Sequence, residues 1–452
     1  MKKLIFLIVI IFSTAKIIAQ NVGIGTTVPS ASAMLDVNST TKGALVPRMT
    51  TAQKNAIVSP AAGLIVFDTE EKTLFMFDGQ QWLGFSPLTN FQRPATNFVY
   101  GPDNLQDTTL TGYSVSMWDQ FVAVGAPYKK TGNITTGGVY IYKLVGGNWQ
   151  FFVSLNPSGN NFQSSFGLSV SLKGNYLIVG APYQKNAGNV QVGAAYMYNF
   201  NGTNWLPTQV ILGSVANTNF GTTVAINQFG TYIAVGETGA QVGALVNCGV
   251  VRVYNKPAST FVLQQSIQDL NPVAGENFGT TLAMSPLGVH IIVGAPGKTV
   301  NGFFNNGYVG QFDRNGSLWT QTHTYTPISE DALGIGTNVD ISDGHVIFTT
   351  AKKREINYSN LSWSGYTATF TDEIHSISID PVTDYFNVFS GNSLYYSLGG
   401  SNTTKYKTLS ADYIYTLPNL LSVYNASFIT GIPTTQNFDK PYVGAIYFGL
   451  FQ

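Results

Sequence analysis

The segment FGLSVSLKGNYLIVGAP, residues 166–182, contains two alternating apolar runs joined by a Gly-Asn turn and ends in Gly-Ala-Pro. A close copy, FGTTLAMSPLGVHIIVGAP, occupies residues 278–296. Alternating apolar residues flanking a turn predict a β-hairpin, because successive side chains of a strand point to opposite faces. The same hairpin occurring twice in one chain indicates a repeat architecture.

Four landmarks recur along the chain. The glycines that begin the first run are 55, 54, 58 and 57 residues apart, at Gly112, Gly167, Gly221, Gly279 and Gly336. The second run ends at Gly125, Gly180, Gly236 and Gly294, and Thr349 takes this place in the fifth copy. An aromatic alternation such as GGVYIYK follows, and then an aromatic residue after a turn, at Trp149, Trp205, Phe261, Trp319 and Trp363.

Each unit therefore predicts four short antiparallel strands, and one such sheet cannot bury both of its faces alone. Units of about fifty residues with four strands are typical of a β-propeller. Residues 89–452 number 364, or 52 for each of seven blades, which is close to the observed spacing. We expect an all-β, seven-bladed β-propeller, with six or eight blades as the alternatives.

These recurring sequence motifs resemble the FG-GAP repeat, the unit of the integrin α-subunit propeller and of many secreted bacterial proteins. The resemblance covers residues 112–363, and residues 374–391, 425–433 and 443–451 look like parts of a sixth and a seventh copy. It implies a protein of recognition. Integrin-type repeats often carry a calcium loop between the first two strands, but here those loops lack three carboxylates at ligand spacing. Asp340 and Asp343 come nearest, and we expect no calcium and no other cofactor.

The last blade lacks a fourth strand, because the chain stops at YVGAIYFGLFQ, which matches a third strand. A spare apolar run, TNFVYG, lies at residues 96–101, ahead of the first repeat. We expect it to supply the missing outer strand and so remove an exposed edge. The alternative is that residues 96–101 are only a linker.

The N-terminal part divides in two. Residues 1–20 have a basic start, a short apolar core and Ala19 ahead of Gln20, which predicts a signal peptide cleaved there and a secreted or outer cell-surface protein. Residues 21–88 predict a small β-rich module with a short helix near TTAQKNAI. NVGIGTT and KGALVPRMT resemble the N-terminal module of secreted Bacteroidota proteins and segments of phage tail fibres. This resemblance implies a stalk or attachment module that forms a homotrimer; a monomeric spacer is the alternative.

Composition excludes several function classes. The formal net charge is zero and 10% of residues are charged, which gives no general attraction to nucleic acid. No stretch beyond the signal peptide reaches the length of a transmembrane span. The four histidines, His290, His323, His345 and His375, lack metal-ligand spacing, and the single cysteine, Cys248, has no nucleophile context. We expect no catalytic residues and no metal ligands.

The candidate binding residues lie in the loops after the Gly-Ala-Pro words. These loops join the second and third strands, emerge on one face of a propeller and are long for hairpin connections. Their aromatic and basic residues predict a rim that binds an anionic or polar partner, either a glycan or a protein. The residues are Tyr128, Lys129, Lys130, Tyr183, Lys185, Lys298, Lys352, Lys353 and Arg354. Alternatively, the lysines only keep glycine-rich loops soluble.

Three functions remain open. The first is a non-enzymatic interaction or adhesion protein that binds its partner through one propeller face. The second is a propeller enzyme that acts on polysaccharide at the central channel. The third is a purely architectural surface subunit. The sequence favours the first over the second, because no catalytic constellation stands out, but fold alone does not fix function.

Overall fold

The structure is a computed structural model of the 452-residue chain. It describes residues 22–70, 73–77, 79, 82–85, 98–99, 110–157, 163–326 and 334–350, and then the strands between 355 and 450. The predicted signal peptide, residues 1–20, lies outside the described residues. The chain forms two compact units that divide between Phe91 and Gln92, three residues beyond the boundary expected from sequence. Within the described residues, no helix is long and apolar enough to span a membrane.

The first unit is small and rich in β structure. A short helix, α2 (Thr51–Asn55), begins at the N-cap Thr50, whose hydroxyl accepts from the Gln53 amide while the Gln53 side chain accepts from the Thr50 amide. Two parallel strands, β1 and β2, form one sheet, and β3 to β6 form a second in which β4 and β5 make an antiparallel hairpin. The strands are β1 (Val22–Ile24), β2 (Leu35–Val37), β3 (Arg48–Met49), β4 (Ile65–Asp68), β5 (Thr73–Phe77) and β6 (Trp82–Phe85).

The second unit consists of antiparallel sheets, and its described residues form seven sheets of four strands. The first four sheets follow the landmarks. They are β8 (Ser114–Trp118), β9 (Phe121–Ala126), β12 (Gly138–Val145) and β13 (Asn148–Leu155); β14 (Ser169–Lys173), β15 (Tyr176–Ala181), β16 (Ala194–Phe200) and β17 (Trp205–Leu212); β18 (Phe220–Ile226), β19 (Tyr232–Glu237), β20 (Val250–Asn255) and β21 (Val262–Ile267); and β22 (Thr281–Met284), β23 (His290–Gly294), β24 (Val309–Asn315) and β25 (Leu318–Tyr325). A small hairpin, β10 (Lys130–Thr131) with β11 (Ile134–Thr135), projects from the first sheet.

The remaining three sheets repeat the pattern with weaker sequence landmarks. They are β26 (Val339–Ile341), β27 (His345–Thr350), β28 (Glu355–Asn360) and β29 (Gly365–Thr369); β30 (Ile374–Ile379), β31 (Phe386–Ser390), β32 (Ser393–Ser397) and β33 (Thr404–Thr408); and β34 (Leu421–Tyr424), β35 (Ser427–Ile432), β36 (Ala445–Leu450) and β7 (Phe98–Val99). The fourth strand of the last sheet is thus β7, from the segment 96–101, which pairs antiparallel with β36.

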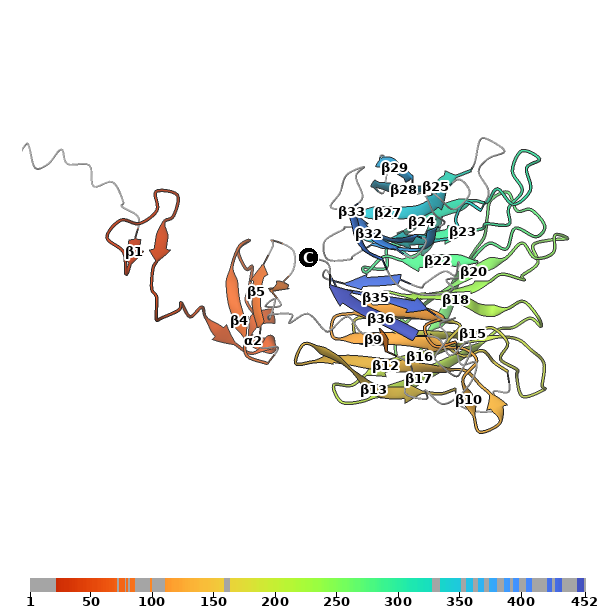
Figure 1. Ribbon diagram of the computed structural model, residues 1–452, viewed down its shortest axis with the longest axis horizontal. Helices are drawn as coiled ribbons and strands as arrows, with labels where there is room; N and C mark the ends of the chain where they lie inside the picture. Colours follow the sequence, from red (N-terminus) through yellow and green to blue (C-terminus); the bar gives the residue numbers. More distant parts are fainter. Residues whose placement is uncertain are drawn as a thin grey trace, which may run out of the picture. The chain divides into compact units, whose positions relative to one another are not determined.

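The sheets close into a ring. The first strand of each sheet contacts the first strand of the next, in the order β8, β14, β18, β22, β26, β30 and β34, and β34 contacts β8 again. The first and last blades accordingly lie side by side, with β9 beside β35 and β36 in Figure 1. A closed ring of radially stacked four-stranded sheets is a β-propeller, so the predicted all-β propeller fold is confirmed.

The Phe-Gly motif of one blade contacts the Gly-Ala-Pro motif of the preceding blade. A Cβ on Gly180 of the second blade would overlap the carbonyl oxygen of Gly221 in the third, and Gly221 itself adopts a left-handed conformation with φ 93°. The Ser169 hydroxyl donates to the same Gly221 carbonyl at 3.3 Å. Because the backbones approach this closely, both positions require glycine. The residues of the repeated motifs therefore form the contact surface between one blade and the next.

Aromatic side chains fill the space between blades. Phe121 of the first blade packs edge-on against Phe200 and Trp205 of the second, with ring centroids 4.7 and 5.4 Å apart. The phenylalanine of the FG word, Phe166, is fully buried and packs against Tyr196 at 5.0 Å. These contacts explain why each repeat carries aromatic residues in its third and fourth strands, since a lone sheet would expose them to water.

Candidate functional site

The loops after the second strands share one backbone frame. In four blades the residue four positions after the landmark glycine donates its amide to the carbonyl of the residue three before it. Its own carbonyl accepts from the amide of a glycine that lies one or two residues before the third strand. These equivalent residues are Lys129, Gln184, Ala240 and Lys298. The turn therefore places the same loop position at the same depth in every one of these blades.

The burial of this loop position corrects the prediction that Lys129 and Lys298 lie on an exposed rim. Lys129 and Lys298 are only 7% and 6% exposed. The Lys129 ammonium donates to Ser154 at 2.6 Å and lies 4.8 Å from the ring centre of Tyr140. Both lysines point into the blades because their loop position turns inward, so neither ammonium group belongs to an accessible rim.

The preceding loop position points outward. Tyr128 and Tyr183 are 44% and 41% exposed, and they follow the Gly-Ala-Pro words of the first and second blades. Together with Lys185 they line a pocket of about 430 Å³. We call it the rim pocket; its other lining residues are Thr135, Gln163, Ser165 and Gln191. Three of the predicted binding residues thus meet in one hollow between the first two blades.

The backbone of the rim pocket belongs to the repeat. Gln163 and Ser165 both adopt left-handed conformations, with φ 57° and 52°. The equivalent residues Asn217 and Asn219 of the next linker have φ 59° and 57°. Left-handed backbone at these two positions therefore recurs in both linkers and is no special strain of this pocket. The side chains, in contrast, are particular to this interface.

A third tyrosine adjoins the pocket and was missed in the sequence. Burial raises the pKa of the Tyr113 hydroxyl, and the nearby Tyr128 and Tyr183 hydroxyls raise it further. Tyr113 follows the first landmark glycine directly, a position held by Leu168 and Thr222 in the next two blades. An aromatic residue at that place in one blade alone is the signal that identifies it.

The other expected rim residues have different outcomes. Lys130 is exposed and lies in the β10–β11 hairpin directly opposite Thr135, which lines the rim pocket. Directly opposed residues of a hairpin share a face, so Lys130 stands beside the pocket. Lys352, Lys353 and Arg354 lie outside the described residues.

The hub of the ring holds a narrow second pocket of about 90 Å³, lined by the first strands. The Lys173 ammonium donates to the Met284 carbonyl, and burial lowers the Lys173 pKa against the opposing effect of Asp340. Asp340 accepts from the Ser378 hydroxyl at 3.1 Å and the Ile379 amide at 2.8 Å, and burial raises its pKa. These groups tie four blades together across the hub.

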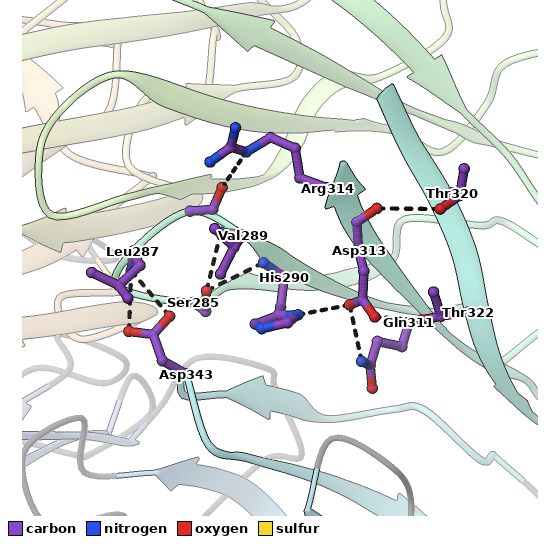
Figure 2. Close-up of polar contacts among 11 residues, drawn as sticks. Ser285, Leu287, Val289, His290, Gln311, Asp313, Arg314, Thr320, Thr322 and Asp343 are labelled. Atoms are coloured by element: carbon purple, nitrogen blue, oxygen red, sulfur yellow. Dashed lines mark hydrogen bonds and ion pairs between the residues drawn. The ribbon is translucent and has the colours of Figure 1, made fainter. Parts of the chain in front are cut away.

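The other acid that the sequence marked is also bound by protein groups. Asp343 accepts from the Leu287 amide of the neighbouring blade at 3.1 and 3.2 Å, as Figure 2 shows. In the same view, His290 contacts Asp313 at 2.7 Å. Burial alone would raise the Asp313 pKa, but hydrogen bonds from His290, Gln311 and Thr322 hold it below its ordinary value. Within the described ranges, no three acidic, histidine or cysteine side chains are grouped as metal ligands are.

Comparison with known proteins places two segments. Residues 23–97 match a family described as a phage tail like trimerisation region, and residues 149–198 match the FG-GAP repeat. No curated protein matches. Among solved structures, one chain of a crystal structure of a mitotic checkpoint complex is 14% identical, with a TM-score of 0.48, and the match covers 79% of this chain and 98% of that one.

Proposed function

We propose that this is an exported, non-enzymatic binding protein whose propeller takes a glycan of a cell surface in the rim pocket. The observation that carries the proposal is the convergence of Tyr128, Tyr183 and Lys185 around a hollow of about 430 Å³. The match to the FG-GAP repeat, a β-propeller interaction module, supports a role in binding.

The side chains of the rim pocket suit a sugar. Exposed tyrosine rings offer flat faces that pack on the apolar faces of a pyranose, and their hydroxyl groups hydrogen-bond. The amides of Gln163 and Gln191 and the hydroxyls of Thr135 and Ser165 supply both donors and acceptors for sugar hydroxyls. Lys185 adds a single positive charge for a carboxylated or sulfated sugar. The volume lies within the usual range of roughly 300–1,000 Å³ for a small-ligand site.

The experiment is a glycan array probed with the mature chain. We expect binding that is lost in Tyr128→Ala/Tyr183→Ala and weakened for acidic glycans in Lys185→Ala. Phe304→Ala is the matched control, because Phe304 is an exposed aromatic residue of the corresponding fourth-blade loop and does not line the rim pocket. Binding that persists in the double tyrosine variant contradicts the proposed site. A wild-type array with no bound glycan contradicts the glycan as partner.

The N-terminal unit supports assembly into a homotrimer. Val22, Ile24 and Leu35 lie in two strands of three residues and are all more than half exposed. Isolated apolar strands this short have too little buried area to be stable in water, and association with further copies would bury them. The match of residues 23–97 to a trimerisation region agrees with this proposal.

Light scattering on the mature chain tests the assembly. The proposal predicts the mass of three chains for wild type and of one chain for Ile24→Asp/Leu35→Asp, since buried charges oppose association. A trimer would carry three rim pockets and strengthen attachment through effective concentration. A monomeric wild type contradicts trimer formation but leaves the rim pocket proposal standing.

A further inference from the structure

Two carboxylates and a lysine are buried together between the third and fourth blades. Asp269 lies two residues after β21, Glu276 lies in the linker that leads to β22, and Lys298 occupies the inward loop position after β23. They are 2%, 0% and 6% exposed. This group of three, which we call the blade 3–4 triad, belongs to neither the rim pocket nor the hub.

The geometry of the triad directs the amine at a carboxyl group. Nζ of Lys298 lies directly against Oδ2 of Asp269 and 3.4 Å from Oε2 of Glu276. The Asn271 carbonyl accepts from the same Nζ at 2.8 Å and holds it in place. Oδ1 of Asp269 accepts from the Asn271 amide at 3.1 Å, which fixes the carboxyl plane. Such close placement raises the effective concentration of two reacting groups by orders of magnitude.

The surroundings favour the uncharged forms of Lys298 and Glu276. The Tyr308 ring lies 4.8 Å from Nζ, and fully buried Cys248 adjoins the triad. Burial lowers the pKa of Lys298 to about 8 and raises that of Glu276 to about 7, with a backbone contact at Val273 opposing part of the rise. A neutral amine is a nucleophile, and a carboxylic acid with such a pKa can exchange protons near neutral pH.

Glu276 has no structural task that explains its position. Neither of its carboxylate oxygens accepts a well-formed hydrogen bond from the described residues, although both are buried. A buried carboxylate without such partners costs stability unless its charge is matched or removed. Its contact with Nζ places it where a proton must leave the amine.

We propose that Lys298 and Asp269 form an intramolecular isopeptide bond, with Glu276 as the proton-transferring catalytic residue. The lone pair of neutral Nζ attacks Cγ of the protonated Asp269 carboxyl group. Glu276 takes one proton from the attacking nitrogen and delivers it to the departing hydroxyl oxygen. The Cγ–O bond breaks, one water molecule leaves, and the Nζ–Cγ amide remains. Glu276 ends in its starting state, and the condensation requires no oxidant, activating nucleotide or metal.

The bond would join adjacent blades by a covalent link. It would connect the end of the third blade to the fourth-blade loop across a neutral amide, which removes two buried charges at once. Cys248 is the only cysteine, so the chain has no route to an intramolecular disulfide. A covalent link of another chemistry would resist pulling and proteolysis on an exported protein.

Mass spectrometry of the full chain tests the bond directly. Trypsin cleaves after Arg252, Lys298 and Arg314, while Lys256 precedes proline and is spared. An amide at Nζ blocks cleavage after Lys298, so the proposal predicts one peptide, 253–314, that lacks the mass of one water molecule. Separate peptides 253–298 and 299–314 of full mass overturn it. Water loss with normal cleavage after Lys298 also overturns it, because that pattern marks a succinimide.

Variants assign the roles. Lys298→Arg and Glu276→Gln should restore the full mass, whereas Asp269→Asn should lose ammonia and give the same linked product as wild type. Lys129→Arg, at the equivalent loop position of the first blade, is the matched control and should leave the linked peptide unchanged. A linked peptide that forms fully in Glu276→Gln overturns the role of Glu276. Since the wild-type peptide map decides whether the bond exists, a variant that fails to fold leaves the test intact.

Discussion

The interface between blades 1 and 2 and that between blades 3 and 4 present the same backbone with opposite chemistry. Lys129 and Lys298 occupy one loop position, make the same amide contacts, and each lies 4.8 Å from the ring of a buried tyrosine. Around Lys129 the structure describes a serine hydroxyl, but around Lys298 it places two carboxylates. Above the first interface lies an open pocket with two exposed tyrosines, whereas the second interface holds the buried blade 3–4 triad.

This difference shows that the repeat fixes the backbone of each interface but leaves the chemistry of its side chains free to vary. The strands and the FG and GAP glycines fix where a loop residue sits. The side chains of the last strand and of the linker that follows it then decide what that residue contacts, as Ser154 of β13 does for Lys129 and Asp269 of the linker does for Lys298. A binding site and a buried reactive group can therefore arise at equivalent interfaces of one ring.

The largest expected effect separates the two lysines. Lys298→Met removes both the amine and the proposed amide and leaves Asp269 and Glu276 as two buried carboxyl groups without a partner, so we expect it to lower the free energy of unfolding by about 3–5 kcal/mol. Lys129→Met loses the hydrogen bond that its ammonium group donates to Ser154, and the loss of that bond costs about 1–2 kcal/mol. Chemical denaturation of both variants measures the difference. Equal losses would contradict the distinction between the two interfaces.

The shared frame predicts equal effects at the two interfaces. A Cβ on Gly125 would overlap the Gly167 carbonyl, and one on Gly236 would lie against Gly279 and the Thr223 hydroxyl. Gly125→Val and Gly236→Val should each destabilise the propeller by about 3 kcal/mol through overpacking. Gly188→Ala is the control, because its new Cβ would meet only the side chain of Asn186. Thermal melts that leave either valine variant unchanged would refute close docking of blades.

A smaller effect concerns pH within the fourth blade. Hydrogen bonds, chiefly from His290, overcome the burial of Asp313 and hold its folded pKa below the unfolded value. A lowered folded pKa contributes stability above the unfolded pKa, near 3.8, and that contribution is lost as pH falls through the folded pKa. Wild type and Asp313→Asn should therefore differ most in stability above pH 5 and converge toward pH 2. Denaturation curves at several pH values test this, and a gap that widens on acidification would contradict it.

The smallest effect on stability belongs to the residues with the largest effect on binding. Tyr128→Ala and Tyr183→Ala remove exposed rings and should change the free energy of unfolding by less than about 0.5 kcal/mol each. Unchanged melting temperatures would show that any loss of glycan binding comes from the pocket itself. A loss of several degrees would instead assign the tyrosines to the packing of the blades.

The propeller could be predicted from the sequence because every contact between these blades needs glycine at the same positions. Gly180 and Gly221 touch across an interface, and neither tolerates a side chain, so the words that contain them recur at blade spacing. The apolar run at 96–101 was recognisable because the last sheet lacked a strand. Residues 352–354 and the signal peptide lie outside the described residues, so the predictions made for them stay predictions.

The candidate site was predicted only in part. The sequence shows which residues belong to a loop, but it does not show which of their side chains are buried. Tyr128, Tyr183 and Lys185 were predicted because they follow Gly-Ala-Pro in two blades, and all three line the rim pocket. Lys129 and Lys298 were misplaced, although Ala240 at the equivalent position signals a buried place. Asp269 and Glu276 could not be predicted from the sequence, because their carboxyl groups contact Lys298 only after two blades pack together.

The closed ring is the claim on which the common face of loops depends, and a cross-link across its seam tests it most directly. Val99 of β7 and Ile446 of β36 are paired residues of adjacent antiparallel strands. Such pairs lie within the Cα separation that a disulfide needs. We predict that Val99→Cys/Ile446→Cys, in a Cys248→Ala background, forms a disulfide under mild oxidation and melts at a higher temperature than its reduced form. Free thiols that persist in the folded protein would contradict the closed ring.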